Sequence, residues 1–188
     1  MSIISKIAHQ ILNNITETSF LRGGEFTQLN GLYHCDCSSY INSILKILDF
    51  SLYRNLCSDR SRLKAIDYFN LSSSNALISY HQKISNIRVG DILVWSKKNV
   101  PKTGDTGHMA IVLTLPILER KGVWRIQVSD SSKMIHDNDS RTSSGVGKGE
   151  MFLLEKNDEI IGYIWSTKRA KNKLCELRAI TFPASLIE

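Results

Sequence analysis

Apolar side chains recur at helical spacing in the first third of the chain. Two segments carry the pattern, residues 3–15 and 36–49. Positions three or four apart share one face of a helix, so each segment is predicted to be an amphipathic helix. Shorter helices are predicted over 61–69 and 74–84, and the glycine-containing stretch 16–33 is predicted to be a loop.

The pattern changes after residue 88. Short apolar runs bounded by polar residues or glycine predict strands, and they cover residues 92–95, 108–115, 123–129, 151–154, 160–166 and 177–182. Asn157, Asp158 and Glu159 separate two of these runs and predict a hairpin. The stretch 131–149 is rich in Ser, Asp and Gly and predicts a long loop, of a length that is usually functional or disordered.

Helices followed by strands predict the α+β class. No repeat or linker interrupts the 188 residues, so we expect one domain, with a helical half over about 1–86 packed on a sheet half over about 87–188. The sheet is expected to be antiparallel, with five to six strands. At 42% hydrophobic residues the chain is able to bury a core, which excludes disorder, a collagen-like repeat and a disulfide-stabilised miniprotein.

Neither hydropathy nor the cysteines indicate a membrane or disulfide-rich protein. No run approaches the roughly 18 apolar residues that a transmembrane helix needs, and the N-terminal residues lack the apolar core of a Sec signal. Localisation stays open between the cytoplasm and export by another route, and no membrane partner is expected. Four cysteines are too few for a disulfide framework, so Cys35, Cys37, Cys57 and Cys175 are interpreted as thiols.

The chain carries 24 Lys and Arg against 18 Asp and Glu, a net charge of +6. The local excess lies in residues 54–64 and 168–178, and neither segment interleaves aromatic side chains with basic ones. Nucleic acid is therefore not an expected partner. A solvated basic face is the simplest interpretation, and the charge permits an anionic partner without naming its chemistry.

Cys37 is the first candidate for chemistry, because it is predicted in the first turn of the second helix. Unpaired N–H groups and the helix dipole favour a thiolate there by about 0.3–1 kcal/mol, which is less than a free thiol needs at neutral pH. A cationic partner is required, and His108 at the start of a strongly apolar strand is the best candidate. Asp130 ends the next strand; if the two strands pair, it lies near His108 and orients the imidazole.

Three segments resemble the NlpC/P60 family of cysteine peptidases, in the same order. Residues 36–41 (Asp-Cys-Ser-Ser-Tyr-Ile) are similar to its Asp-Cys-Ser-Gly motif, 88–95 (Arg-Val-Gly-Asp-Ile-Leu-Val-Trp) to its Gly-Asp segment, and 107–113 (Gly-His-Met-Ala-Ile-Val-Leu) to its Gly-His strand. The resemblance implies a papain-like fold and a bacterial cysteine amidase, without metal or cofactor. It also implies Cys37 as nucleophile, His108 as base and Asp130 as the third polar residue.

The chain departs from the family pattern at three points. Ser39 replaces the usual Gly, Cys35 lies two residues before the nucleophile, and the secretory signal usual for wall hydrolases is missing. These departures concern the substrate, which is expected to be a peptide or a peptidoglycan fragment. The side chains expected to contact this substrate are Asp36, Ser38, Trp95, Gly107, His136 and Arg141.

The stretch after Asp130 is not part of the minimal family pattern. It is interpreted either as a substrate-gripping flap or as a mobile polar loop. As a flap, it would pair Arg141 with a substrate carboxylate, and the glycines at 145, 147 and 149 would let backbone approach the ligand. His136 competes with Asp130 for the third catalytic role.

Several alternatives stay open at this point. The same residues would serve a deamidase or acyltransferase that modifies a protein, and a papain-like groove without activity would bind a peptide or glycan. An inhibitory partner protein is compatible with either. Cys35 is a weaker nucleophile candidate. A zinc site from His34, Cys35, Cys37 and His108 is disfavoured, because Cys-x-Cys lacks the usual ligand spacing.

Overall fold

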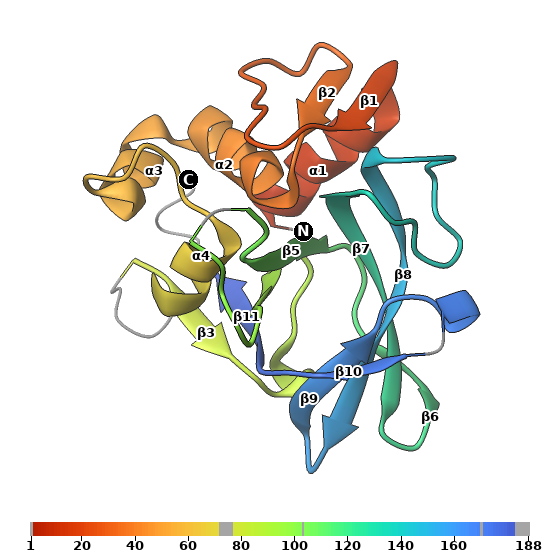
Figure 1. Ribbon diagram of the computed structural model, residues 1–188. Coiled ribbons are helices and arrows are strands. Elements are labelled where there is room, and N and C mark those ends of the chain that lie inside the picture. Colours follow the sequence, from red (N-terminus) through yellow and green to blue (C-terminus); the bar gives the residue numbers. More distant parts are fainter. Residues whose placement is uncertain (1, 72–76, 103, 170, 183–188) are drawn as a thin grey trace.

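The computed structural model describes residues 2–71, 77–102, 104–169 and 171–182. In this part of the chain four α-helices come first, followed by the strands of a large antiparallel sheet (Figure 1). The helices are α1 (Ile3–Asn14), α2 (Cys37–Leu48), α3 (Phe50–Cys57) and α4 (Ala65–Leu71). The α+β class and the two long helices predicted from apolar spacing are thus confirmed.

The shorter helices differ from the prediction. Asp49 ends α2 and also caps α3, where its Oδ1 accepts the Leu52 N–H at 2.9 Å. The sequence predicted the end of α2 near Asp49 but not the new helix that begins at Phe50. The helix predicted over 61–69 begins at Ala65. The helix predicted over 74–84 is wrong where the structure describes it, because 79–81 form a strand and 84–86 a 3₁₀ turn. Its first part lies outside the described residues.

Nine strands of the described chain form one sheet, and two more form a separate parallel pair. The sheet order is β10-β9-β8-β7-β5-β4-β11-β3, with β6 also paired to β7. The strands are β1 (Glu17–Phe20), β2 (Leu32–Cys35), β3 (Ser79–His81), β4 (Ile92–Ser96), β5 (Gly107–Val112), β6 (Ile117–Arg120), β7 (Val123–Ser132), β8 (Gly145–Lys156), β9 (Glu159–Ile164), β10 (Asn172–Leu174) and β11 (Leu177–Thr181).

The prediction of five to six strands was too low, because the additional strands are short and exposed. β6 and β10 are exposed at every position, and β3 is exposed at two of three. Such strands have no apolar alternation for a sequence pattern to detect. Asn157 and Asp158 form the predicted hairpin turn between β8 and β9, and both adopt the positive φ that such turns use.

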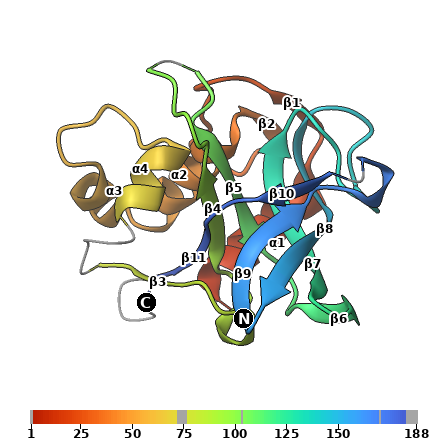
Figure 2. The ribbon, with the colours of Figure 1, turned by 60° about the horizontal axis from the view of Figure 1, so that its bottom comes forward.

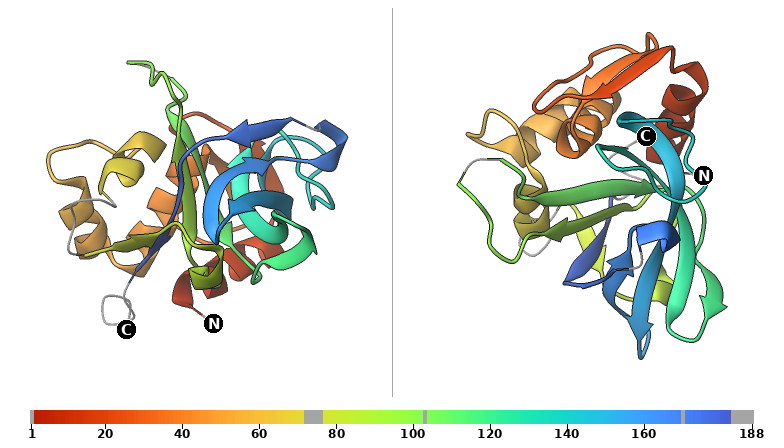
Figure 3. Two further views of the ribbon diagram at one scale, coloured as in Figure 1. Left: turned by 90° about the horizontal axis from the view of Figure 1, so that it is seen from below. Right: turned by 45° about the vertical axis from the view of Figure 1, so that its right-hand side comes forward.

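Two predicted loops contain regular structure. Residues 16–33 include β1 and the start of β2, which pair in parallel and lie against β8; the right-hand view in Figure 3 shows this pair at the red-orange end of the molecule. Within 131–149, β7 continues to Ser132 and β8 begins at Gly145. The connection is therefore shorter than predicted.

The central strands β4 and β5 are buried on both faces because successive side chains alternate between two cores. Ile92 and Val94 join the cluster that contains the helices, whereas Leu93 and Trp95 join a second cluster with β7, β8 and β9. Figures 2 and 3 show helices α2, α3 and α4 on one side of β4 and β5, and the C-terminal strands on the other. The start of α2 therefore meets the sheet beside β5 and β7.

Candidate active site

Cys37 is the first residue of α2 and lines a cavity of about 650 Å³. The helix begins there because Asp36 caps it: Oδ1 of Asp36 accepts the Ser39 N–H at 2.8 Å and the Ser38 hydroxyl at 2.9 Å. Backbone N–H groups of a first turn have no partner within the helix. The Cys37 thiol therefore lies at the positive end of the α2 dipole.

Arg62 holds the Asp36 carboxylate from its other side. Its Nη2 lies 3.1 Å from Oδ2 of Asp36, and its Nη1 donates to the hydroxyl of Ser39 at 2.6 Å. Burial raises the pKa of Asp36, but hydrogen bonds from the Ser39 N–H and from Arg62 outweigh it and lower the pKa. Asp36 and Ser38, expected to contact substrate, border the cavity but use their polar atoms to form the helix start.

Two buried hydrogen bonds fix the start of α2 against β7. The Tyr40 hydroxyl lies 2.8 Å from Oγ of Ser129. The Ser131 hydroxyl of β7 donates at 2.6 Å to the carbonyl of Cys35, the last residue of β2. Since both partners on β7 flank Asp130, the thiol and this carboxylate are held in one rigid frame.

His108 lies on β5 and contacts Asp130 on the neighbouring strand β7. The antiparallel pairing of β5 with β7 brings the two together, and Nε2 of His108 lies 2.6 Å from Oδ2 of Asp130. The ring is packed between Trp95, with centroids 5.2 Å apart, and Trp165, edge-on at 5.0 Å. The imidazole is therefore held by its contact with Asp130 and by the two indole rings.

Gly107 allows β5 to approach β4 closely beside this histidine. Its φ is +152°, and a Cβ built there would lie 2.1 Å from the Trp95 carbonyl oxygen. A larger residue would push the strand away and move His108 with it. Gly107 and Trp95 both line the cavity, as expected from the sequence, and their observed contacts position the histidine.

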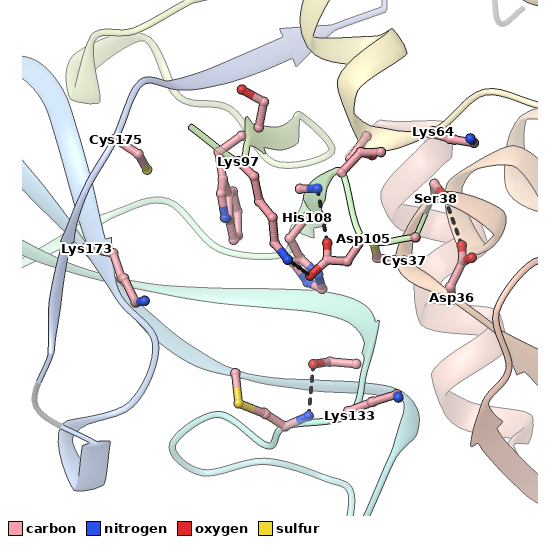
Figure 4. A pocket seen from close by; sticks show the side chains of 18 of the residues that line it. Asp36, Cys37, Ser38, Lys64, Lys97, Asp105, His108, Lys133, Lys173 and Cys175 are labelled. Carbon is pink, nitrogen blue, oxygen red and sulfur yellow. Dashed lines mark hydrogen bonds and ion pairs between the residues drawn. The ribbon is translucent and has the colours of Figure 1, made fainter. Parts of the chain in front are cut away.

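The Cys37 thiol and the His108 ring point toward one another in the cavity (Figure 4). Nε2 of His108 is occupied by Asp130, which leaves Nδ1 for the thiol. Burial lowers the pKa of His108, but the Cys37 thiolate and the hydrogen bonds with Asp130 and Cys37 raise it to about 10. The arrangement brings a thiol at a helix N-terminus together with a histidine whose pKa is raised.

Asp130 is fully buried and contacts three cations or potential cations. Besides His108, Nε2 of His136 lies 3.2 Å from Oδ2, and Nη1 of Arg141 lies 2.9 Å from Oδ1. Burial raises the pKa of Asp130, but His136, Arg141 and His108 together hold it well below its usual value. The sequence left Asp130 and His136 as competitors for one role; the structure places Asp130 between the two histidines.

His136 and Arg141 do not line the cavity, which corrects their expected contact with a substrate. Arg141 is 7% exposed, and it binds Asp130 and, through two nitrogens, Asp139. His136 is 3% exposed and stacks on Trp165 with ring centroids 4.1 Å apart. Buried ion pairs of this kind leave no free donor for a ligand.

The glycines of β8 make room for these side chains and not for a ligand. A Cβ on Gly147 would lie 2.4 Å from Cγ of Arg141, and one on Gly149 would lie 2.6 Å from Cβ of His136. The connection between β7 and β8 therefore folds back onto β8. At its start, Ser132, Lys133 and Met134 line the cavity, whereas His136 and Arg141 turn into the protein.

Several cavity-lining residues were not found by the sequence analysis. Tyr163 packs on Trp95 with centroids 4.6 Å apart, and Lys97, Lys133 and Lys173 come from three separate segments. No motif or spacing in the sequence connects these positions to Cys37. The basic segment 168–178 was the one available signal, and it was interpreted as a solvated face.

The other three cysteines differ from Cys37. Cys35 is buried, and burial raises the pKa of its thiol to about 12. Cys57 is buried in the helical core, as expected for a packing residue. Cys175 packs against the second core cluster, as expected for a packing residue, and it also lines the cavity. Burial raises the pKa of its thiol to about 11. Ionisation at neutral pH is disfavoured at Cys35 and Cys175.

Within the described ranges, no cluster of three or more His, Cys, Asp or Glu side chains is arranged to bind a metal ion. The helices in this part of the chain are too short or too polar to cross a bilayer. Comparisons of the chain with models of protein families, with curated proteins and with solved structures found no match.

Proposed function

We propose that this protein is a cysteine hydrolase with a papain-like, NlpC/P60-type catalytic domain that cleaves a peptide or amide bond, with peptidoglycan peptides as the first substrates to test. The observation that carries the proposal is the juxtaposition of Cys37 and His108 in one cavity, with Asp130 buried behind the histidine and in contact with it. A helix start supplies the nucleophile and two paired strands supply the base and its orienting carboxylate.

The first half of the reaction forms an acyl-enzyme. The Cys37 thiolate attacks the carbonyl carbon, and the oxygen becomes an oxyanion beside the Cys37 N–H at the start of α2. The tetrahedral intermediate collapses as His108 gives its proton to the leaving amine. The products are a free amine and a thioester on Cys37.

The second half restores the enzyme with one water molecule. His108, now neutral, removes a proton from water, and the hydroxide attacks the thioester carbonyl. Collapse of that intermediate releases a carboxylic acid and the thiolate. Asp130 holds the imidazole in orientation throughout and stabilises the imidazolium.

The state of His108 supports this assignment. With its pKa raised to about 10, the ring is an imidazolium at neutral pH. A protonated histidine beside a thiolate is what expulsion of an amine requires, because an amine leaves as a neutral molecule only after protonation.

Substitution of the two reacting groups tests the proposal. Cys37→Ala and His108→Ala are each expected to abolish hydrolysis of a panel of muropeptides and short peptides, with the folded circular dichroism spectrum retained. His9→Ala, a histidine on α1, is the matched control and keeps full activity. Hydrolysis that survives in Cys37→Ala would overturn the assignment.

Product analysis separates hydrolysis from the related reactions. Transfer of the acyl group to an added amine, or release of ammonia from glutamine, would use the same residues and the same thioester. Mass spectrometry of the wild type with each panel peptide is expected to detect the acyl-enzyme on Cys37. A panel in which no peptide acylates Cys37 but several bind would favour the silent binding module.

A further inference from the structure

The wall of the cavity is strongly basic. Seven of its lining side chains are Lys or Arg and two are Asp. This excess of five positive charges compares with a net charge of +6 for the whole chain. The basic character, which appears dispersed along the sequence, is therefore concentrated around one cavity in the folded protein.

Most of these charges have no carboxylate partner. Asp36 neutralises Arg62, and Asp105 neutralises Lys97 at 2.7 Å. Among the residues that the structure describes, the other basic side chains of the wall form no ion pair, and they are Arg22, Lys64, Lys98, Lys133 and Lys173. An unpaired excess of this size on a concave surface is available to a ligand.

These five residues surround the reacting pair from different sides. Arg22 follows β1, Lys64 precedes α4, Lys98 follows β4, Lys133 follows β7 and Lys173 lies on β10. Figure 4 shows Lys64, Lys133 and Lys173 on three separate segments that surround Cys37 and His108. The cations thus come together around one cavity only when the chain is folded.

Like charges gathered on a concave wall focus a positive potential. Such clefts raise the local concentration of oppositely charged ligands and speed their association by about 10–10³-fold. In the proposed mechanism the Cys37 thiolate and the His108 imidazolium carry opposite charges, so together they do not cancel the charge of the wall. A neutral or cationic substrate would gain nothing from this arrangement.

We infer that the substrate of this site is an acidic peptide that carries carboxylates close to the scissile amide bond. The inference rests on the proposed function, because a thiolate attacks an acyl carbon, which a peptide supplies and a phosphodiester backbone does not. Lysine ammonium groups on flexible stems are able to pair with carboxylates at several positions. The basic wall therefore selects among peptides, and the Cys37–His108 pair performs the cleavage.

A pair of alkylating reagents tests the inference without a known substrate. Iodoacetamide is neutral and iodoacetate is its anionic analogue, and the rate at which each labels Cys37 is measured by mass spectrometry. The iodoacetate-to-iodoacetamide rate ratio is compared with the same ratio for N-acetylcysteinamide. At low ionic strength the ratio on Cys37 is expected to be about tenfold higher, and to fall toward that of the free thiol in 1 M NaCl, where the screening length is about 3 Å.

Charge-matched variants locate the effect. Lys98→Glu/Lys173→Glu is expected to lower the ratio severalfold. Lys121→Glu/Lys156→Glu changes the net charge equally at two exposed positions outside the cavity wall and is expected to leave the ratio unchanged. An equal drop in both double variants would show a general charge effect and overturn the inference.

The two proposals fail in different ways. Slow labelling by iodoacetamide, at the rate of N-acetylcysteinamide, would contradict the reactive Cys37–His108 pair whatever the ratio. Fast labelling by iodoacetamide with an iodoacetate-to-iodoacetamide ratio equal to that of N-acetylcysteinamide would contradict the acidic substrate and leave the proposed catalytic pair in place. Hexaglutamate, but not hexalysine, is expected to slow the labelling of Cys37 by iodoacetamide. If oligothymidylate slows the labelling and hexaglutamate does not, the ligand of the basic wall is a nucleic acid and not an acidic peptide.

Discussion

Two groups of charged side chains lie within reach of His108, and they are built in opposite ways. Behind the histidine, Asp130, Asp139, His136 and Arg141 form a buried cluster in which opposite charges pair. In front of it, lysines on the cavity wall are mostly exposed and unpaired. The buried cluster contacts His108 itself, whereas the exposed group faces the space a substrate would occupy.

Solvation explains the contrast. A charge removed from water without a partner costs several kcal/mol, so a buried cluster must be neutralised internally. An exposed ammonium keeps its water and needs no partner. Neutralised buried charges therefore hold geometry, and unpaired exposed charges remain available to a ligand. Each prediction below tests whether the two groups have these separate roles.

The largest expected effect is that of Asp130→Asn. The amide is unable to stabilise the imidazolium of His108, so turnover of the best panel peptide is expected to fall on the order of 10³–10⁴-fold, as loss of the carboxylate does in related triads. Asp137→Asn is the matched control, because Asp137 is a buried carboxylate in the connection that follows β7 and accepts the Thr167 N–H at 2.8 Å instead of contacting His108. An equal loss in both variants would mean that Asp130 acts through the fold and not through the histidine.

Arg141→Met is expected to reduce stability most. Removal of the cation leaves Asp130 and Asp139 buried with less compensation, at a cost of about 3–5 kcal/mol. Arg125→Met is the control, since Arg125 pairs with Glu119 and Glu150 on the surface and its loss is expected to be much smaller. Urea unfolding measures the unfolding free energy of both variants. An equal decrease in the two would contradict the distinction between buried and exposed ion pairs.

The stability contribution of His108 is expected to depend on pH. Its pKa is raised from about 6.5 to about 10, so the contribution is complete below pH 6.5 and is lost as the pH rises toward about 10. The difference in unfolding free energy between the wild type and His108→Gln should shrink from pH 6 to pH 10. A difference that stays constant over this range would contradict a charged pair at this position, and His9→Gln serves as the control.

The smallest expected effect is on stability at the cavity wall. Lys98→Gln/Lys173→Gln is expected to change the unfolding free energy by less than about 0.5 kcal/mol, because both side chains are exposed and form no ion pair. The same variant is expected to lower the iodoacetate-to-iodoacetamide ratio at Cys37. A large loss of stability would show that the wall supports the fold and would end the contrast with the buried cluster.

Local patterns account for what was predicted well. The two long helices, the central strands and the hairpin at Asn157 follow from apolar spacing and turn residues, which depend on near neighbours. The start of α2 at Cys37 follows from the capping residue Asp36. Exposed strands such as β6 and β10 were missed because their pairing depends on partners elsewhere in the sheet.

The sequence by itself determined that Cys37 begins a helix and that His108 and Asp130 occupy neighbouring apolar strands. Those features rest on hydrogen bonds and spacing within short segments. Only the tertiary structure decided which charges are buried: Arg141 was expected at the substrate and lies behind Asp130, whereas Lys173 came from an apparently solvated segment and lies at the cavity. Burial depends on how segments far apart in the sequence pack together, and no local pattern of residues predicts that packing.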